Sequence, residues 1–388
     1  MSHRFGRVPR ATQVRLSVIA GVLAVATIVG LFLLRPTGEE RKSLEGLGFT
    51  SETYSAVVEK AEELPCEGQA EGGVVCRFIT FKLTEGPNDD EFVTQQLVVS
   101  RTTPALEPGD KVMMAFDPLV EREFQYRYYD RERGPVLLWL SLLFAGAVVA
   151  LGRLRGVSAL IGLVASFVVL LQFILPAILD GRDPLMVAIF GSAAVAFIAL
   201  YTAHGFGAMT TIALIGTLAS LAVVAVLANL FVGLTVLSGF GSEEAVVVQI
   251  GASNVDLVGI VLGGIVIGAL GAIDDMTVTQ ASAVWELHAA NPRMGTGVLL
   301  RSALSIGRDH VASTVNTLAL AYAGASMPIL LLLILSQQNL ATVISGEVIA
   351  TEVVRTLVGS IGLVTAVPLT TALAVFAVKT SGPQPATE

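Results

Sequence analysis

Several uninterrupted apolar runs of roughly 20 residues each constrain this chain most strongly. An α-helix needs about that many apolar residues to cross the hydrocarbon core of a bilayer. Only 14% of the residues are charged, whereas about a quarter are charged in an ordinary soluble domain. The sequence therefore predicts a polytopic α-helical membrane protein.

We expect about eight transmembrane helices, of which the first is an uncleaved anchor. Four arginines precede its apolar run, which is longer than the core of a signal peptide and is not closed by an A-x-A site. The expected spans lie near residues 16–34, 135–151, 157–179, 184–203, 207–232, 254–273, 311–335 and 354–378. The predicted parts are a cytoplasmic N-terminus with the anchor (1–34), a polar domain (35–134), a seven-helix membrane domain (135–380) and a cytoplasmic tail (381–388).

The positive charges of the connectors predict the orientation of these spans. Most arginines and lysines outside the polar block fall on the side of the N-terminal arginines: Arg153, Arg155, Arg293, Arg301, Arg308 and Lys379. Arg182 and Arg355 are the exceptions. Cytoplasmic loops carry this excess, so we expect both termini in the cytoplasm and residues 35–134 outside.

The polar block at 35–134 predicts a small β-rich domain. Strand-like runs at 54–58, 74–83 and 92–99 are separated by turn sequences such as EGPNDD. We expect a small barrel or sandwich, with an OB-like barrel as one option. The chain's two cysteines, Cys66 and Cys76, lie in this block. A disulfide is the favoured interpretation if the block is outside the cytoplasm. A metal site formed by the two cysteines is less favoured, because no histidine lies near them in the sequence.

Two adjacent carboxylates end the glycine-rich sixth span, in GALGAIDDMTVTQ. Ionisable groups at membrane depth are costly and suggest function. Asp274 and Asp275 repel each other, so such a pair suits the binding and release of a proton. If the helix continues, Asp275 aligns with Thr279, Ser282 and Glu286, and Asp256 shares a face with Asp274. The alternative is that both aspartates are solvated at a helix end.

Two further groups of polar residues lie in the last two spans. In IGRDHVASTVNT, Asp309, Ser313 and Asn316 share a face beside Thr314, and Arg308 could neutralise Asp274 or Asp275. An interfacial charge cluster explains Arg308 and Asp309 equally well. In the last span, Glu352 and Arg355 are spaced i, i+3, and a structural ion pair is the better interpretation.

Enzymatic chemistry has no sequence support. The chain contains no Walker A loop, no H-E-x-x-H, no G-x-S-x-G and no Cys/His metal cluster. We therefore expect no catalytic residues, no resident metal and no cofactor. The net charge of −8 arises within residues 35–134, and an acidic excess argues against a nucleic-acid binder, which would show a basic face.

The three blocks GALGAIDDMTVTQASAVWELHAANP, IGRDHVASTVNTLALAYAG and EVVRTLVGSIGLVTAVPLT resemble the bacterial YibE/F-like membrane proteins. The likeness covers most of the chain, the domain after the first helix included. It implies a membrane architecture and little chemistry. The family pattern has one aspartate in the first block, preceded by an apolar residue, and the resemblance places Asp275 at the aspartate and Asp274 at the apolar position.

A second resemblance is architectural only. A glycine-rich span ending in aspartate, followed by a threonine-rich span, is similar to the resistance-nodulation-division transporters and to the SecD/SecF proteins. Those proteins insert an external domain after their first helix and use membrane aspartates to carry protons.

These patterns favour a proton- or cation-coupled secondary transporter of the bacterial cytoplasmic membrane, acting on an unknown solute or ion. Asp275, Asp274, Asp309 and Arg308 are the expected coupling residues, and Asp256, Ser313, Thr314, Asn316, Thr279 and Glu286 the expected pathway lining. A non-transporting envelope accessory or assembly protein, whose external domain binds a partner, is the alternative. The other expected partners are membrane lipids and a second copy of the chain in a homo-oligomer.

Overall fold

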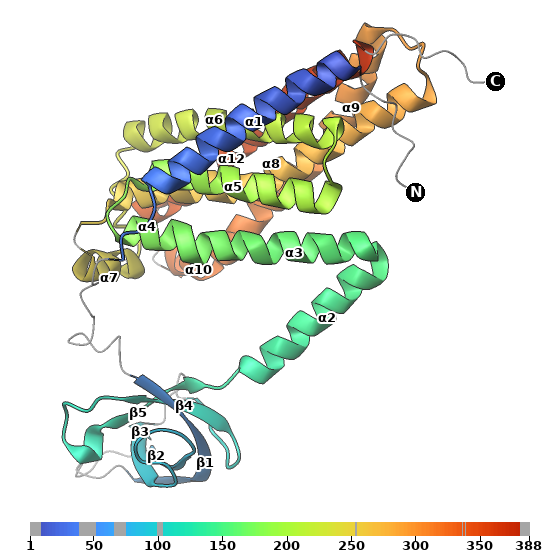
Figure 1. Ribbon diagram of the computed structural model, residues 1–388. Helices are drawn as coiled ribbons and strands as arrows, with labels where there is room; N and C mark the ends of the chain where they lie inside the picture. The colour runs from blue at the N-terminus through green and yellow to red at the C-terminus, as the bar shows by residue number, and fades with distance from the viewer. Residues whose placement is uncertain are drawn as a thin grey trace. The chain divides into compact units, whose positions relative to one another are not determined.

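The computed structural model describes residues 9–38, 52–65, 75–98, 104–252, 254–335, 337 and 339–380. The chain divides into two compact units (Figure 1). One unit comprises residues 42–147, and the other joins residues 1–41 to residues 148–388. Each unit is described by itself.

The smaller unit contains a curled, five-stranded antiparallel sheet. Its strands are β1 (Glu52–Pro65), β2 (Val75–Leu83), β3 (Phe92–Val98), β4 (Lys111–Phe116) and β5 (Tyr126–Arg131), with a 3-10 turn η2 (Arg122–Phe124) before β5. The strand order is β3-β2-β1-β4-β5. The outer strands β3 and β5 also approach each other, because Gln95 donates to the Tyr126 carbonyl and accepts from the Tyr128 N–H at 2.9 Å. The predicted β-rich region is confirmed.

Alternating apolar side chains give this sheet its core. In β2 the buried Ile79, Phe81 and Leu83 follow a spacing of two residues. Val112 and Met114 of β4 complete the cluster from across the sheet. Of the predicted disulfide only Cys76 is described, and it is buried in β2; Cys66 lies outside the described residues.

The larger unit is helical. Its described helices include α1 (Arg10–Leu33), α3 (Leu154–Val169), the π-helical turn η3 (Leu170–Ile174), α4 (Leu175–Leu179), α5 (Pro184–His204), α6 (Ala208–Leu234), α7 (Glu243–Gly251), α8 (Leu257–Ala290), α9 (Thr296–Ala325), α10 (Met327–Leu335), α11 (Leu340–Ser345) and α12 (Glu347–Lys379). Helix α2 (Gly134–Gly152) joins the two units in sequence. Within the described residues, seven helices are long and apolar enough to cross a membrane, or eight if α9 and α10 form one bent span.

The expected span at 311–335 differs most from the structure. Its helix begins earlier, at Thr296, and breaks at Ser326, where α10 turns away from α9 by 63°. Pro328 favours a break here, because it has no N–H to donate to the Gly324 carbonyl and its ring would clash with that carbonyl in a continuous helix. Helix α8 is longer than the expected span at 254–273, because it continues to Ala290.

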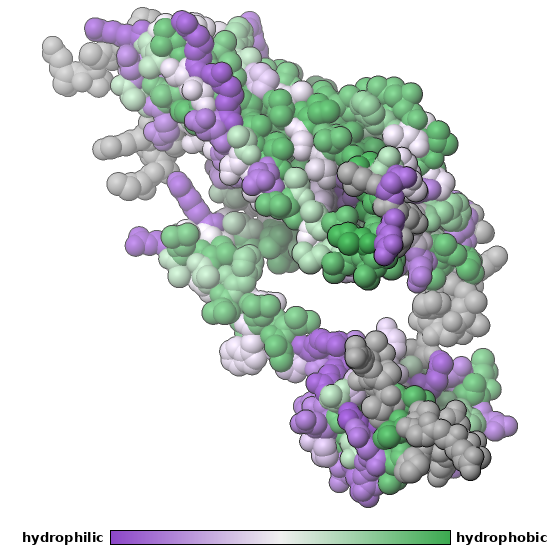
Figure 2. Space-filling view, turned by 180° about the vertical axis from the view of Figure 1, so that it is seen from behind, coloured by the Kyte–Doolittle hydropathy of each residue, from purple (hydrophilic) through white to green (hydrophobic). Residues whose placement is uncertain are grey.

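Helix α8 lies at the centre of the helical unit. It contacts α5, α6, α9 and α12, and their apolar side chains form the largest buried cluster. Helix α2, by contrast, has no buried residue, and the exposed face of α1 is apolar over most of its length. Hydrophobic side chains cover much of the helical unit, while hydrophilic ones gather at the end where α12 stops (Figure 2). This distribution fits a membrane protein, whose surface meets lipid.

Candidate functional site

The two adjacent aspartates of α8 lie in different surroundings. The Asp275 side chain is 69% exposed, and its Oδ2 atom lies 3.8 Å from Nε2 of His310 in α9. Asp274 is half-buried, and its enclosed Oδ1 atom has no hydrogen-bond partner among the described residues. Successive residues of an α-helix point about 100° apart, so neighbours at the edge of a buried face separate in this way. The structure therefore distinguishes an enclosed carboxylate from an exposed one.

A pair of buried hydroxyl groups lies one helical turn beyond Asp274. Thr277 of α8 and Thr217 of α6 are both fully buried, with their Oγ1 atoms 2.7 Å apart. The Thr277 hydroxyl also lies 3.0 Å from the carbonyl oxygen of Asp274, to which it can donate. These bonds connect the backbone at Asp274 to α6.

Gln280 connects α8 to two other helices. Its side chain is 1% exposed, and its Nε2 donates to the Ala303 carbonyl of α9 at 2.8 Å and to the Thr371 hydroxyl of α12 at 2.7 Å. Gly307 of α9 lies against the same side chain, since a Cβ there would meet Gln280 Oε1 at 2.7 Å. The absence of a side chain at Gly307 thus allows α9 to approach the Gln280 amide.

Thr370 of α12 presents a second enclosed polar atom without a partner. Its residue is fully buried, and its Oγ1 has no hydrogen-bond partner among the described residues. A Cβ on Gly216 of α6 would overlap this oxygen. Glycine at 216 is therefore what lets α6 and α12 approach each other at Thr370.

The predicted pair Glu352–Arg355 is confirmed in α12, with Arg355 Nη1 donating to Glu352 Oε1 at 2.8 Å. The guanidinium also lies 5.9 Å from the ring centre of Tyr322 in α9, within the range of a cation–π contact. The Tyr322 hydroxyl in turn lies close to Gly268, where a Cβ would meet it at 2.8 Å. This group links α8, α9 and α12 away from Asp274.

The predicted residues of α9 lie mainly at the surface of the helical unit. Arg308, Asp309, Ser313 and Asn316 are exposed, and Thr314 is half-buried with its hydroxyl donating to the His310 carbonyl. Arg308 Nε lies 3.4 Å from the Leu304 carbonyl of its own helix. Among the described ion pairs, the basic partner of Asp275 is His310, not the expected Arg308.

The remaining predicted residues lie along α8. Asp256 is at the N-cap position, before the first helical residue, and is exposed. Thr279 is half-buried and Glu286 exposed, so the polar face predicted from Asp275 to Glu286 lies on the side of α8 that its neighbours leave partly open. Asp256 and Glu286 therefore belong to the two ends of a long helix, far from the buried hydroxyl groups.

The sequence reasoning missed His310 and the buried polar residues Thr217, Thr277, Gln280 and Thr370. The sequence contains a signal for two of these residues, Thr277 and Gln280. They follow the apolar Ile273 and precede the apolar Val284 at successive spacings of four, three and four residues, which is the pattern of one helix face. That alignment places both on the apolar face, where a polar side chain needs a partner. Among the described residues, no group of three or more His, Cys, Asp or Glu could hold a metal ion.

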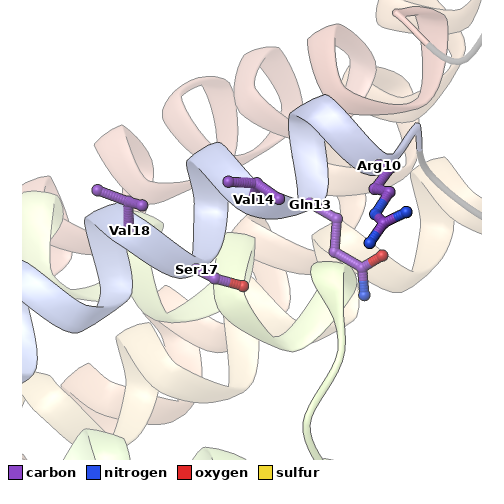
Figure 3. Close-up of a pocket in the computed structure, with 5 residues that line it drawn as sticks. All are labelled: Arg10, Gln13, Val14, Ser17 and Val18. Carbon is purple, nitrogen blue, oxygen red and sulfur yellow. The ribbon is translucent and has the colours of Figure 1, made fainter.

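Two surface hollows lie along α1 and involve none of these residues. One, of about 420 Å³, is lined by Arg10, Gln13, Val14, Ser17 and Val18 (Figure 3). In that view Arg10 and Gln13 project from one side of the helix while Val14 and Val18 lie along its apolar side. The other hollow, of about 400 Å³, lies between α1, α5 and α6.

Comparison with known protein families gives one result. A family described as YibE/F-like protein matches residues 140–380, which span more than half of the chain. The chain belongs to the YibE/F-like family. The matched segment runs from within α2 to just after the end of α12, so it contains α6, α8, α9 and α12. It does not include the β-rich region, to which the sequence analysis had extended the likeness. Neither the curated proteins nor the solved structures gave a match.

Proposed function

We propose that this YibE/F-like protein is a proton- or cation-coupled secondary transporter of the bacterial cytoplasmic membrane, and that Asp274 is its main coupling residue. One observation carries the proposal: Asp274 has an enclosed, unpartnered carboxylate oxygen on the most central helix. A carboxylate at membrane depth needs a neutralising proton or cation, and such groups mark ion pathways.

In this proposal, hydrogen bonds near Asp274 connect the binding of an ion to movement between α8 and α6. The backbone of Asp274 accepts the Thr277 hydroxyl, and Thr277 pairs with Thr217 of α6. Neutralising the carboxylate changes the field on these hydroxyl groups and on the contact between α8 and α6. Asp275 and His310, at the exposed side of the same turn, would deliver or receive the ion.

The topology of the proposed transporter follows the charges of the connectors. Both termini would be cytoplasmic and the β-rich region external. The strand order β3-β2-β1-β4-β5, with β3 approaching β5 through Gln95, is the order of an OB-like barrel. In the proposed topology the β-rich region would be outside the cytoplasm, where it would contact a partner or the transported solute. No enzymatic step and no cofactor enter the proposal.

Flux measurements in proteoliposomes test the role of Asp274. The purified full-length protein is reconstituted with an internal pH-sensitive dye, and inward gradients of Na⁺, K⁺ or Mg²⁺ are imposed in turn. We expect a proton flux above that of empty liposomes for at least one cation, a loss of at least tenfold in Asp274→Asn, and a smaller loss in Asp275→Asn. Glu244→Gln, which removes an exposed carboxylate of α7 outside the proposed pathway, is the matched control.

A coupled flux that is the same in Asp274→Asn and in the parent protein would remove Asp274 from the mechanism. The absence of flux for every gradient would favour the alternative, an accessory protein that holds a partner. Two observations support that alternative: α9 has an exposed polar face, and Leu119 of the β-rich unit is 89% exposed.

A further inference from the structure

Only the first part of helix α9 has fully buried residues, while its second part packs against the helical unit on one side. Its buried residues are Leu299, Ala303 and Gly307, and none of the residues from Arg308 to Ala325 is buried. Helix α10, which follows the break, has no buried residue either. One side of the second part of α9 is therefore exposed at the surface of the unit. On a helix that crosses a membrane, such a side contacts either lipid or another protein.

The exposed side of α9 carries a row of polar residues beside the apolar Ile306 and Leu320, whereas that of α2 is mostly apolar. Ser305, Asp309, Ser313 and Asn316 follow one another at spacings of four, four and three residues, so they lie on one side of the helix. All four are exposed, and their side chains make no hydrogen bond to the residues that the structure describes. We call this set the α9 polar face.

Within the expected span at 311–335, lipid cannot cover Ser313 and Asn316 of the α9 polar face without leaving polar groups unpaired. The exposed residues of α2, such as Leu138, Leu140 and Leu143, show what a lipid-covered surface looks like in this chain. Acyl chains offer no hydrogen bonds, and an unpaired amide such as that of Asn316 is costly in hydrocarbon. In membranes, serine and asparagine side chains instead bond across to another helix.

The charges beside the α9 polar face favour a second copy of the same chain. Two copies in one membrane share one orientation, so their two-fold axis runs along the membrane normal and each residue meets its own equivalent at the same depth. Arg308 and Asp309 are adjacent, exposed and of opposite charge. Their levels differ by about 1.5 Å along the helix, so Arg308 of one copy can reach Asp309 of the other.

We infer that the protein is a homodimer whose two α9 polar faces pack against each other, with Asn316 and Ser313 bonding across the axis and Arg308 pairing with Asp309. The inference is independent of transport, since it concerns what covers α9 and not what passes through the protein. The small residues Ala312 and Ser313 on this side let the two helices approach closely.

Cysteine cross-linking in native membranes tests the interface. Ser313→Cys and Asn316→Cys are introduced separately into the full-length protein, and mild oxidation should yield a product of twice the chain's mass. Val22→Cys, on the exposed apolar side of α1, is the matched control and should remain monomeric. In a second measurement, Asn316→Leu in the Ser313→Cys background should reduce the cross-linked fraction severalfold. Single-molecule photobleaching of the labelled Asn316→Leu protein should also show fewer spots that bleach in two steps, which report dimers.

Three outcomes would overturn the inference. The first is a monomer by photobleaching, without cross-linking at either position. The second is a cross-linked product that contains a different protein, which would assign the α9 polar face to another partner. The third is rapid reaction of both cysteines with a membrane-impermeant maleimide, as fast as that of Arg293→Cys in the connector before α9, which would show that the face lines a water-filled path.

Discussion

The amide of Gln280 should hold α8, α9 and α12 together, and replacing it with methionine isolates this contribution. Methionine has a similar length and fills the same space, so the change leaves little cavity. It removes the two hydrogen bonds from Nε2, at 2.8 Å to Ala303 and 2.7 Å to Thr371. A hydrogen bond contributes about 0.5–1.5 kcal/mol in a soluble protein and about 0.6 kcal/mol on average between membrane helices.

The expected loss in the free energy of unfolding is therefore about 1–2 kcal/mol for the two bonds together. The lower part of this range applies if the Ala303 carbonyl and the Thr371 hydroxyl keep their helical partners; Thr371 also donates to the Val367 carbonyl at 2.6 Å. Gln280→Ala should cost more, about 2–4 kcal/mol, because the enclosed side chain would leave a cavity.

Reversible unfolding of the full-length protein in mixed micelles, driven by a denaturing detergent, measures these differences. Ser282→Ala is the matched control, since it removes a half-buried hydroxyl of the same helix for which no hydrogen bond is described. It should change the free energy of unfolding by less than about 0.5 kcal/mol. A Gln280→Met protein as stable as the parent would refute the assignment of Gln280 as the link between the three helices.

Three other changes test two close helix contacts and one ion pair of the β-rich region. Gly216→Ala should lower the free energy of unfolding by about 1–3 kcal/mol, because the added methyl group overlaps the Thr370 hydroxyl. Adding Thr370→Ala should restore part of this loss. A double variant as unstable as Gly216→Ala alone would contradict the overlap. Gly307→Ala should reduce stability similarly by separating α9 from α8, as measured by the same unfolding assay. In the β-rich region, a hydrogen bond from Arg133 and then one from the Arg131 N–H hold the pKa of Asp130 below its ordinary value. The stability from this pairing is therefore present above the ordinary carboxyl pKa and lost as the pH falls through the lowered one. Arg133→Gln should raise the pKa of Asp130, as followed by NMR titration of the full-length protein in nanodiscs.

Long apolar runs made most of the helices predictable. The expected span at 184–203 corresponds to α5, and that at 207–232 corresponds to α6 within two residues at each end. These helices have clear ends: Asp183 caps α5 by accepting from the Met186 N–H, and Gly205, with φ of 76°, ends it. Length and composition decide such elements because a bilayer admits few other backbone structures.

The break between α9 and α10 was not predicted, because hydropathy is continuous across it. Residues 311–335 read as one apolar run, and the signal for the break is a single proline at 328. Prolines do not always break a membrane helix: Pro368 lies inside α12, which continues from Glu347 to Lys379. The packing of neighbouring helices decides between the two outcomes, and a single sequence does not contain that information.

The contrast between Asp274 and Asp275 also depends on packing. The sequence suggested Asp275, since Thr279 and Glu286 extend its face. In the structure those residues mark the side of α8 that is partly open, and a carboxylate there can exchange a proton or cation with water at any time. Asp274 is half-buried, and its Oδ1 atom is enclosed by the packing around α8. In the proposed transporter, occupation of that atom by an ion would be coupled to movement of α8 against its neighbours. Asp274 is therefore the more informative of the two positions for a test of coupling.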